Sequence, residues 1–147
     1  MGQVTKPEIA RVQLENIPQA LKNIDRWFLW RHVVKDDGTW GKMPTRAEKF
    51  LRNGQSTNKD GGTFVPFDEA VNWLNYHNDR GDNVGLSTAM GIKGEPGNIL
   101  GLDFDGCLSG KQELSVWADE ILREVEGIAY VEVSPSGTGL KAMINGN

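Results

Sequence analysis

Two aspartates stand one residue apart in the stretch ILGLDFDGCLSG, at the end of a run of apolar residues. Side chains alternate between the two faces of a β-strand, so a strand here places Leu102 and Phe104 on one face and Asp103 and Asp105 on the other. Carboxylates this close repel each other unless a cation lies between them, and carboxylate oxygens suit Mg²⁺ or Mn²⁺. The spacing therefore predicts a divalent metal site. The alternative is a strand that ends in a polar turn at Asp105-Gly106, with Asp103 as a surface residue.

A loop of small residues comes later in the chain, in the stretch EVSPSGTGLK. Small residues let backbone N–H groups approach a ligand closely, as the oxyanions of a phosphate require. Lys141 follows the loop and provides a point charge for phosphate. Many tight turns are also rich in serine and glycine, so the loop alone is a weak indication of a phosphate site.

Composition favours one globular domain with a real core, since the chain has 147 residues of which 38% are hydrophobic. No apolar run approaches the ~18 residues of a membrane span, and we expect no membrane partner. The single cysteine, Cys107, excludes an internal disulfide and is expected to be a small buried residue. The N-terminus lacks the basic start and apolar centre of a secretory signal, so we expect a cytoplasmic protein.

Hydrophobic periodicity and turn residues predict the elements that position these groups. A short helix begins at Pro18 and ends near Asp25, and a hairpin follows, with strands over 26–34 and 39–44 that Pro44 closes. Further elements are a long loop over 45–65, a helix over 67–78, strands over 83–88, 99–104, 128–133 and 140–144, and a helix over 114–125 that Gly127 ends. This order indicates an α+β or α/β fold, with helices packed on a mixed sheet.

Two known families share the first stretch. LGLDFDGCL resembles the nucleophile motif of haloacid dehalogenase-like phosphatases, in which Asp103 would become phosphorylated and Asp105 would act as acid and base. That motif normally lies near the N-terminus, and only 42 residues follow Asp105 in this chain. The phosphatase is therefore the less favoured alternative.

A second resemblance covers most of the chain. RWFLWRHVVKDDGTWGKMP, FDEAVNWL, NVGLST, ILGLDFDGC and YVEVSPSGTGLK are similar, in the same order, to segments of primase-polymerase domains of the archaeo-eukaryotic primase superfamily. Such domains stand at the N-terminus of phage, plasmid and bacterial replication proteins. The resemblance implies a nucleotidyltransferase, a DNA primase or DNA polymerase, that uses Mg²⁺ or Mn²⁺ and nucleotide triphosphates.

The resemblance also implies roles for residues. Asp103 and Asp105 would be catalytic metal ligands, and the triphosphate would lie along the small-residue loop, on Ser134, Ser136, Gly137, Thr138, Gly139 and Lys141. Lys141 stands where the family usually has histidine, which puts proton transfer at that position in doubt. The family's third acidic motif is expected beyond residue 147, so we expect a single incomplete domain, residues 1–147, with weak activity or none. Glu132 would share a strand face with Ser134, but a solvated strand residue is an equal interpretation.

Nucleic acid is the other expected partner, as single-stranded or primer-template DNA. The net charge is −4, yet nine basic residues between Lys22 and Lys59 outnumber the acidic ones there. A solvated face explains this pattern, but the mixture of charge and aromatic rings also suits a single strand. The candidate contacts are Trp40, Lys42, Arg46, Lys49 and Arg52.

Further expectations concern the remaining tryptophans, the two histidines and the kind of protein. We expect Trp27, Trp30 and Trp73 mainly in the core, His32 in a structural role, and His77 exposed to solvent near a helix end. A non-catalytic nucleic-acid or nucleotide-binding module with the same fold remains the alternative function. Family analogy alone suggests a helicase domain in the parent chain.

Overall fold

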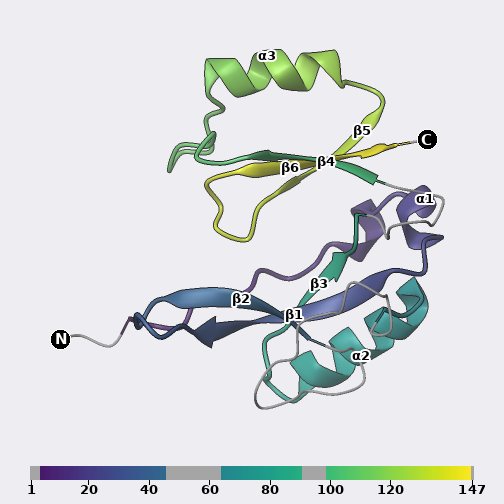
Figure 1. The fold of residues 1–147 in the computed structure, drawn as a ribbon, viewed down its shortest axis with the longest axis vertical. Coiled ribbons are helices and arrows are strands. Elements are labelled where there is room, and N and C mark those ends of the chain that lie inside the picture. The colour runs from purple at the N-terminus through teal and green to yellow at the C-terminus, as the bar shows by residue number, and fades with distance from the viewer. Residues whose placement is uncertain (1–3, 46–63, 91–98, 147) are drawn as a thin grey trace. The chain divides into compact units, whose positions relative to one another are not determined.

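The structure is a computed structural model that describes residues 4–45, 64–90 and 99–146. It forms two compact units, with the chain up to Ala89 in the first and from Met90 onward in the second. Each unit contains a three-stranded sheet and helices (Figure 1), which confirms the α+β class. The expectation of one mixed sheet is wrong, because all strand pairs of the described residues are antiparallel and fall into two sheets.

The sheet of the first unit has the order β2-β1-β3. Its strands are β1 (Trp27–Val34), β2 (Trp40–Thr45) and β3 (Gly85–Thr88). The predicted hairpin is confirmed: the Lys35 N–H donates to Thr39 across the turn, and Gly38 adopts a φ of +80°, a conformation that glycine adopts without strain.

Pro44 does not close β2, contrary to the sequence prediction. The strand continues to Thr45, and Pro44 lies opposite Trp30 of β1. Because β2 is an edge strand of this sheet, a residue without an N–H costs no ladder hydrogen bond on the outer side.

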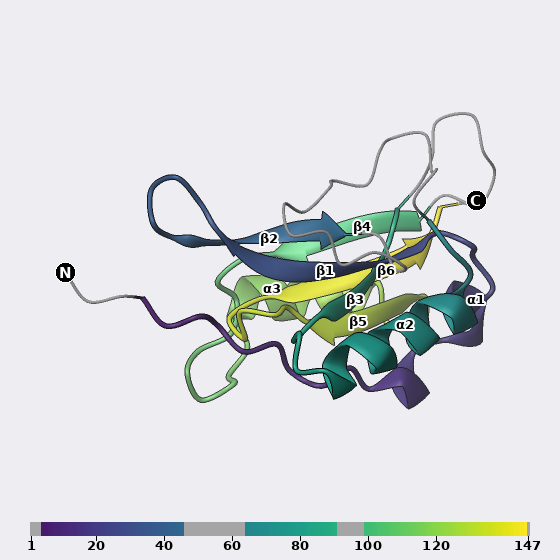
Figure 2. The same ribbon diagram turned by 90° about the horizontal axis from the view of Figure 1, so that it is seen from below.

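Helix α2 (Phe67–Asp79) packs on β1 and β3, as Figure 2 shows. Two short turns precede the sheet, η1 (Leu14–Asn16) and α1 (Gln19–Lys22), so the helix predicted from Pro18 is shorter than expected. The Trp27 ring meets Phe67 edge to face at 4.9 Å between ring centroids, and its indole N–H donates to the Leu21 carbonyl. Trp27 and Trp30 are buried, as predicted, whereas Trp73 is only half-buried.

His77 is buried, so the prediction of an exposed side chain is wrong. Phe67, Ala70, Leu74 and His77 recur at intervals of three and four residues and form the buried face of α2. The Nδ1 atom of His77 lies 3.3 Å from Asp82 Oδ2. This polar partner compensates part of the free-energy cost of burying an imidazole ring.

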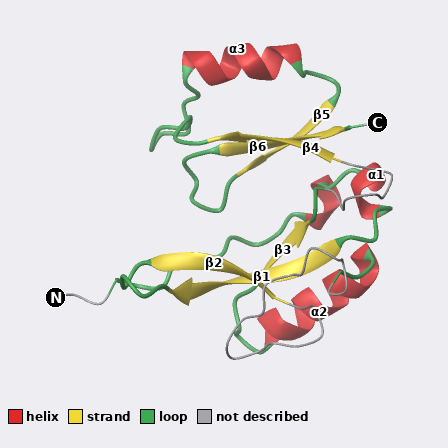
Figure 3. Ribbon diagram, viewed as in Figure 1, coloured by secondary structure: helices red, strands yellow, loops and turns green. Residues whose placement is uncertain are grey.

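The second unit contains β4 (Ile99–Phe104), α3 (Val116–Glu124), β5 (Ala129–Val133) and β6 (Leu140–Asn145). The sheet order is β4-β6-β5, and β6 is antiparallel to both neighbours. Strands β4 and β5 therefore run parallel to each other, joined by α3, with the last strand inserted between them. Figure 3 shows α3 in red along one face of this yellow sheet.

The core of the second unit lies between the sheet and α3. Its buried members are Phe104, Cys107, Ala118, Leu140 and Ala142. Burial of Cys107 is as predicted. Phe104 stacks on Trp117 of α3 at 6.0 Å between ring centroids. Because Phe104 faces the helix, the strand alternation leaves Asp103 on the opposite face of the sheet.

In the described part of the chain, no helix has the length and apolar character needed to cross a membrane.

Candidate functional site

The acidic pair lies where β4 ends. Asp103 is the second-last residue of β4, and Asp105 follows the strand in a turn that Gly106 completes with a φ of +64°. Both aspartates are exposed residues. The predicted alternation is confirmed at Phe104, which is buried against the helix side. The polar turn at Asp105-Gly106 and the exposed Asp103 match the alternative interpretation, and because Asp105 lies outside β4, strand alternation does not place it beside Asp103.

Lys141 is the cross-strand partner of Asp103 in the register of β4 and β6. Its Nζ atom lies 3.6 Å from Asp103 Oδ2, and the side chains are 32% and 57% exposed, respectively. An ion pair this exposed contributes about 0.2 to 1 kcal/mol. The pair is therefore weak enough for another cation to replace Lys141 at Asp103, or for another anion to replace Asp103 at Lys141.

The predicted phosphate loop connects β5 to β6 as residues 134–139. Its three hydroxyl groups form a chain, with Ser134 Oγ 2.9 Å from Ser136 Oγ and Ser136 Oγ 3.0 Å from Thr138 Oγ1. The N–H groups of Gly137 and Gly139 donate to the Ser134 carbonyl and hydroxyl oxygens. In this state the loop satisfies these groups internally, so a phosphate ligand has to replace hydrogen bonds within the loop.

Close packing holds this loop against the acidic stretch. A Cβ atom added at Gly139 would lie 2.7 Å from the Phe104 carbonyl oxygen and 3.6 Å from Asp105 Cα. The Leu108 N–H donates to the Thr138 carbonyl at 3.0 Å. The structure therefore brings together the two stretches that the sequence singled out, and Lys141 is the second residue of β6, the strand that follows their junction.

Glu132 lies on the same face of the sheet as Asp103 and Lys141, on the third strand, β5. It lies opposite Lys141 in the register of β5 and β6, just as Asp103 does on the other side. Burial raises the pKa of Glu132, while a hydrogen bond from Tyr130 and the charge of Lys141 act to lower it. Burial, the Glu132 charge and the hydrogen bond raise the pKa of Tyr130 to about 12. The face thus carries a row of three charged groups with a tyrosine beside them.

Only part of this row was accessible to sequence reasoning. The sequence is compatible with Glu132 either as a site residue or as a solvated strand residue, and no motif singles out Tyr130. The signal in the sequence is the spacing Tyr130, Glu132, Ser134, which places these residues on one face of a regular strand. The pairing with Lys141 also requires the register of β5 and β6, which the sequence pattern does not determine.

The donor set suits a divalent cation that takes most of its ligands from water and substrate. Two carboxylates are the usual protein contribution to a Mg²⁺ ion bound together with phosphate groups. Within residues 4–45, 64–90 and 99–146, no group of three or more His, Cys, Asp or Glu side chains could hold a metal ion.

The candidate nucleic-acid contacts lie in the first unit. Trp40 and Lys42 share one face of β2, and their partners in β1 are Val34 and His32. This is the sheet face opposite Trp27, whose ring contacts α2. The Trp40 indole N–H donates to the Val4 carbonyl at 2.9 Å, and Lys42 is exposed. Arg46, Lys49 and Arg52 lie outside the described residues.

His32 lies on this face beside aromatic and basic side chains. Its ring meets the Trp30 ring edge to face, with 5.2 Å between centroids. Burial lowers the pKa of His32, a hydrogen bond with the Gly41 backbone acts to raise it, and the charges of Lys42 and Lys6 add smaller lowering effects. This environment favours the neutral imidazole and fits the structural role expected for it.

A scan of protein-family models finds no match to the chain, and a search of curated proteins finds no similar sequence.

Proposed function

We propose that this chain carries nucleotidyl transfer machinery of a DNA primase or DNA polymerase that acts in replication. The observation that carries the proposal is the junction of the acidic stretch with the small-residue loop, in which Lys141 pairs with Asp103 at 3.6 Å. Metal ligands, a phosphate-binding loop and a phosphate-binding cation are the parts that such a site requires. Their order along the chain also fits the resemblance to primase-polymerase domains.

The chain's own residues would act on the nucleotide in three ways. Asp103 and Asp105 would hold Mg²⁺ or Mn²⁺, which supplies charge stabilisation for the attacking and leaving oxygens. The hydroxyl groups of Ser134, Ser136 and Thr138 would exchange their mutual hydrogen bonds for bonds to phosphate oxygens. The Lys141 ammonium would bind phosphate as a point charge with three hydrogen-bond donors.

Trp40 and Lys42 support a second part of the proposal, a single-stranded or primer-template DNA partner. An exposed ammonium group next to an indole suits a strand bound through phosphate contacts and base stacking.

A non-catalytic module that binds nucleotide or nucleic acid is the second candidate. The ion pair between Lys141 and Asp103 favours it, because it neutralises a proposed metal ligand with a side chain of the protein itself. The internal hydrogen bonds of the loop favour it as well. The two candidates differ in whether nucleotide binding requires the acidic pair and a divalent cation.

The decisive experiment compares the wild-type chain with Asp103→Asn, Asp105→Asn. We expect Mn²⁺-dependent binding of a fluorescent nucleotide triphosphate by the wild type and a loss of at least about tenfold in the double variant, since charged ligands contribute several kcal/mol to such sites. Primer extension is measured in parallel, and we expect it to be weak.

The matched control is Glu120→Gln, Glu124→Gln, which removes the same charge from exposed positions of α3. This control should bind nucleotide as the wild type does. Nucleotide binding that needs no divalent cation and survives the Asp103 and Asp105 substitutions would contradict nucleotidyl transfer and support the binding module.

A further inference from the structure

Three charged side chains stand in a row across the sheet of the second unit. The register of the three strands places Asp103 of β4, Lys141 of β6 and Glu132 of β5 directly opposite one another. Directly paired residues share a face, with Cβ atoms about 4.5 to 5.5 Å apart. One ammonium group therefore lies between two carboxylates, on the face opposite α3.

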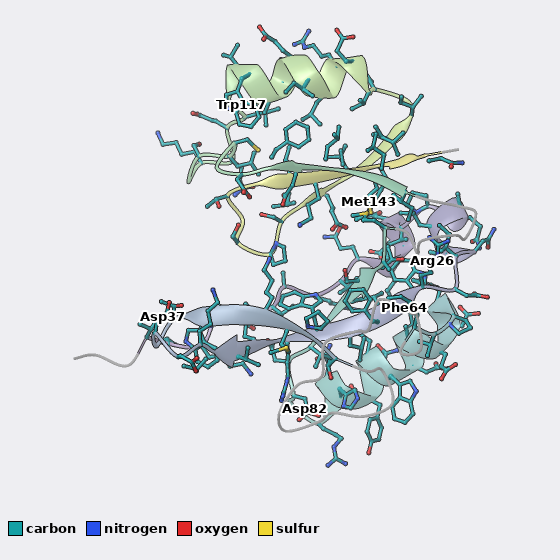
Figure 4. All side chains as sticks on the ribbon, in the orientation of Figure 1. Arg26, Asp37, Phe64, Asp82, Trp117 and Met143 are labelled. Carbon is teal, nitrogen blue, oxygen red and sulfur yellow. The ribbon has the colours of Figure 1, made fainter. Side chains whose placement is uncertain are left out.

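The two carboxylates differ in their surroundings. Asp103 is 57% exposed and belongs to the acidic pair. Glu132 is less exposed, accepts a hydrogen bond from Tyr130, and interacts with the charge of Lys141. Met143, the residue after next from Lys141, lies on this same sheet face, as Figure 4 shows with its label on the side away from Trp117 of α3.

A cation that binds Asp103 has to displace Lys141 from it. A lysine without a carboxylate partner would remain as a positive charge next to the incoming cation, and like charges this close repel each other. Glu132 offers a second carboxylate within reach, because the flexible four-carbon stem of lysine lets its ammonium move between neighbouring strands.

We propose that Glu132 is a positioning residue for Lys141, which receives the lysine ammonium when Asp103 binds a divalent cation. Resting on the proposed function, this inference adds that metal binding and the position of the phosphate-binding lysine are coupled. In the metal-free state Lys141 neutralises Asp103. In the metal-bound state Lys141 pairs with Glu132, beside the start of the loop that is proposed to hold the triphosphate.

The experiment measures Mn²⁺ affinity from the electron paramagnetic resonance signal of free Mn²⁺, at pH 7.5 and about 0.15 M salt. The variants of the 147-residue chain are Glu132→Gln, Lys141→Met and their combination. Glu120→Gln on α3 is the matched control for loss of one carboxylate. Thermal unfolding of every variant verifies that it is folded.

We expect Lys141→Met to bind Mn²⁺ about threefold or more tightly, because the competing cation is gone. Glu132→Gln should bind about threefold more weakly, because Lys141 then has only Asp103 as a partner. In the Lys141→Met background the Glu132→Gln effect should disappear. Strands lie about 4.8 Å apart, so Glu132 is two strands or roughly 10 Å from Asp103, a distance at which salt screens a direct effect.

Two results would overturn the inference while leaving the proposed function intact. The first is unchanged Mn²⁺ affinity in Glu132→Gln. The second is an equal effect of Glu132→Gln with and without Lys141, which would mean that Glu132 acts on the cation directly. Mn²⁺ affinity that is unchanged in Asp103→Asn, Asp105→Asn would instead overturn the metal site itself, and the proposed function with it.

Discussion

Gly139 is the residue at which the loop and the acidic stretch meet. An alanine Cβ there would lie 2.7 Å from the Phe104 carbonyl oxygen, which is closer than real Cβ contacts, and the obstacle is backbone. The site thus requires glycine for close approach of two chain segments. The sequence indicated a glycine-rich loop, but the segment it approaches became evident only in the structure.

We predict that Gly139→Ala destabilises the protein by about 1 to 3 kcal/mol, as overpacking typically does. It should also weaken metal-dependent nucleotide binding, because the loop moves away from Asp105. Urea unfolding and nucleotide titration measure the two effects. Gly110→Ala is the control, since no atom lies within 4 Å of a Cβ built there, and it should leave both quantities nearly unchanged.

The pKa of Tyr130 provides a test of the row formed by Asp103, Lys141 and Glu132. This pKa of about 12 lies above the ordinary value near 10 in the unfolded chain, mainly because of burial and then because of Glu132. The folded protein therefore holds this proton to higher pH than the unfolded chain does. Its contribution to stability is complete below pH 10 and is lost as the pH rises through about 12.

We expect the tyrosinate absorbance of a Tyr76→Phe variant, in which Tyr130 is the remaining tyrosine, to titrate with a midpoint clearly above 10. Adding Glu132→Gln should lower that midpoint, because the negative charge is removed while the burial remains. A midpoint that Glu132→Gln does not move would contradict the contact between Tyr130 and Glu132.

At the scale of elements, α3 and the sheet of the second unit are held together by a small core. Phe104 is buried at 4% exposure and stacks on Trp117, while Ala118 is completely buried. Strand β4 therefore presents Asp103 on one face and packs against α3 through the next residue, Phe104, on the other face. The orientation of the acidic site depends on this packing.

We predict that Phe104→Ala destabilises the protein by about 3 to 5 kcal/mol, the usual cost of removing a buried aromatic ring. Urea unfolding followed by circular dichroism measures the loss. Leu100→Ala in the same strand is the control, because Leu100 is 54% exposed, and it should cost less than about 1 kcal/mol. Equal losses in the two variants would contradict the assignment of Phe104 to the core.

Local patterns predicted most of these elements, since the hairpin, the strand at 99–104 and the two longer helices depend on periodicity and turn residues. The errors have physical causes. His77 was expected to be exposed because it is polar and near a helix end, but it completes the stripe of Phe67, Ala70 and Leu74. The row through Glu132, Lys141 and Asp103 depends on the register between strands, and no local pattern specifies which residues are opposite one another.

For the whole molecule, charge is the property most relevant to a nucleic-acid partner. The chain has a net charge of −4, so any affinity for DNA has to come from local basic groups. Lys42 is an exposed lysine beside Trp40 on one face of the first sheet. The sequence indicated this mixture, and the described residues place two of its members on one strand.

We expect single-stranded DNA binding by the chain to weaken steeply with salt. Lys42→Gln should weaken binding and reduce the slope of log affinity against log salt by about 0.7, the value for one phosphate contact on a single strand. Fluorescence anisotropy at several salt concentrations measures the slope. Arg123→Gln on α3 is the control, since Arg123 already pairs with Asp119, and a slope that changes equally in both variants would contradict a specific contact at Lys42.

The position of β6 between β4 and β5 has a consequence for biosynthesis. Both outer strands pair only with β6 among the described strands, and β6 follows them in the chain. A ribosome adds about 5 to 20 residues per second, so β4 leaves it roughly 2 to 7 seconds before β6 begins to emerge, whereas β5 precedes β6 by about a second. The acidic pair and the small-residue loop therefore come together only when β6 emerges, and until then the edge of β4 that pairs with β6 has no partner strand among the described residues.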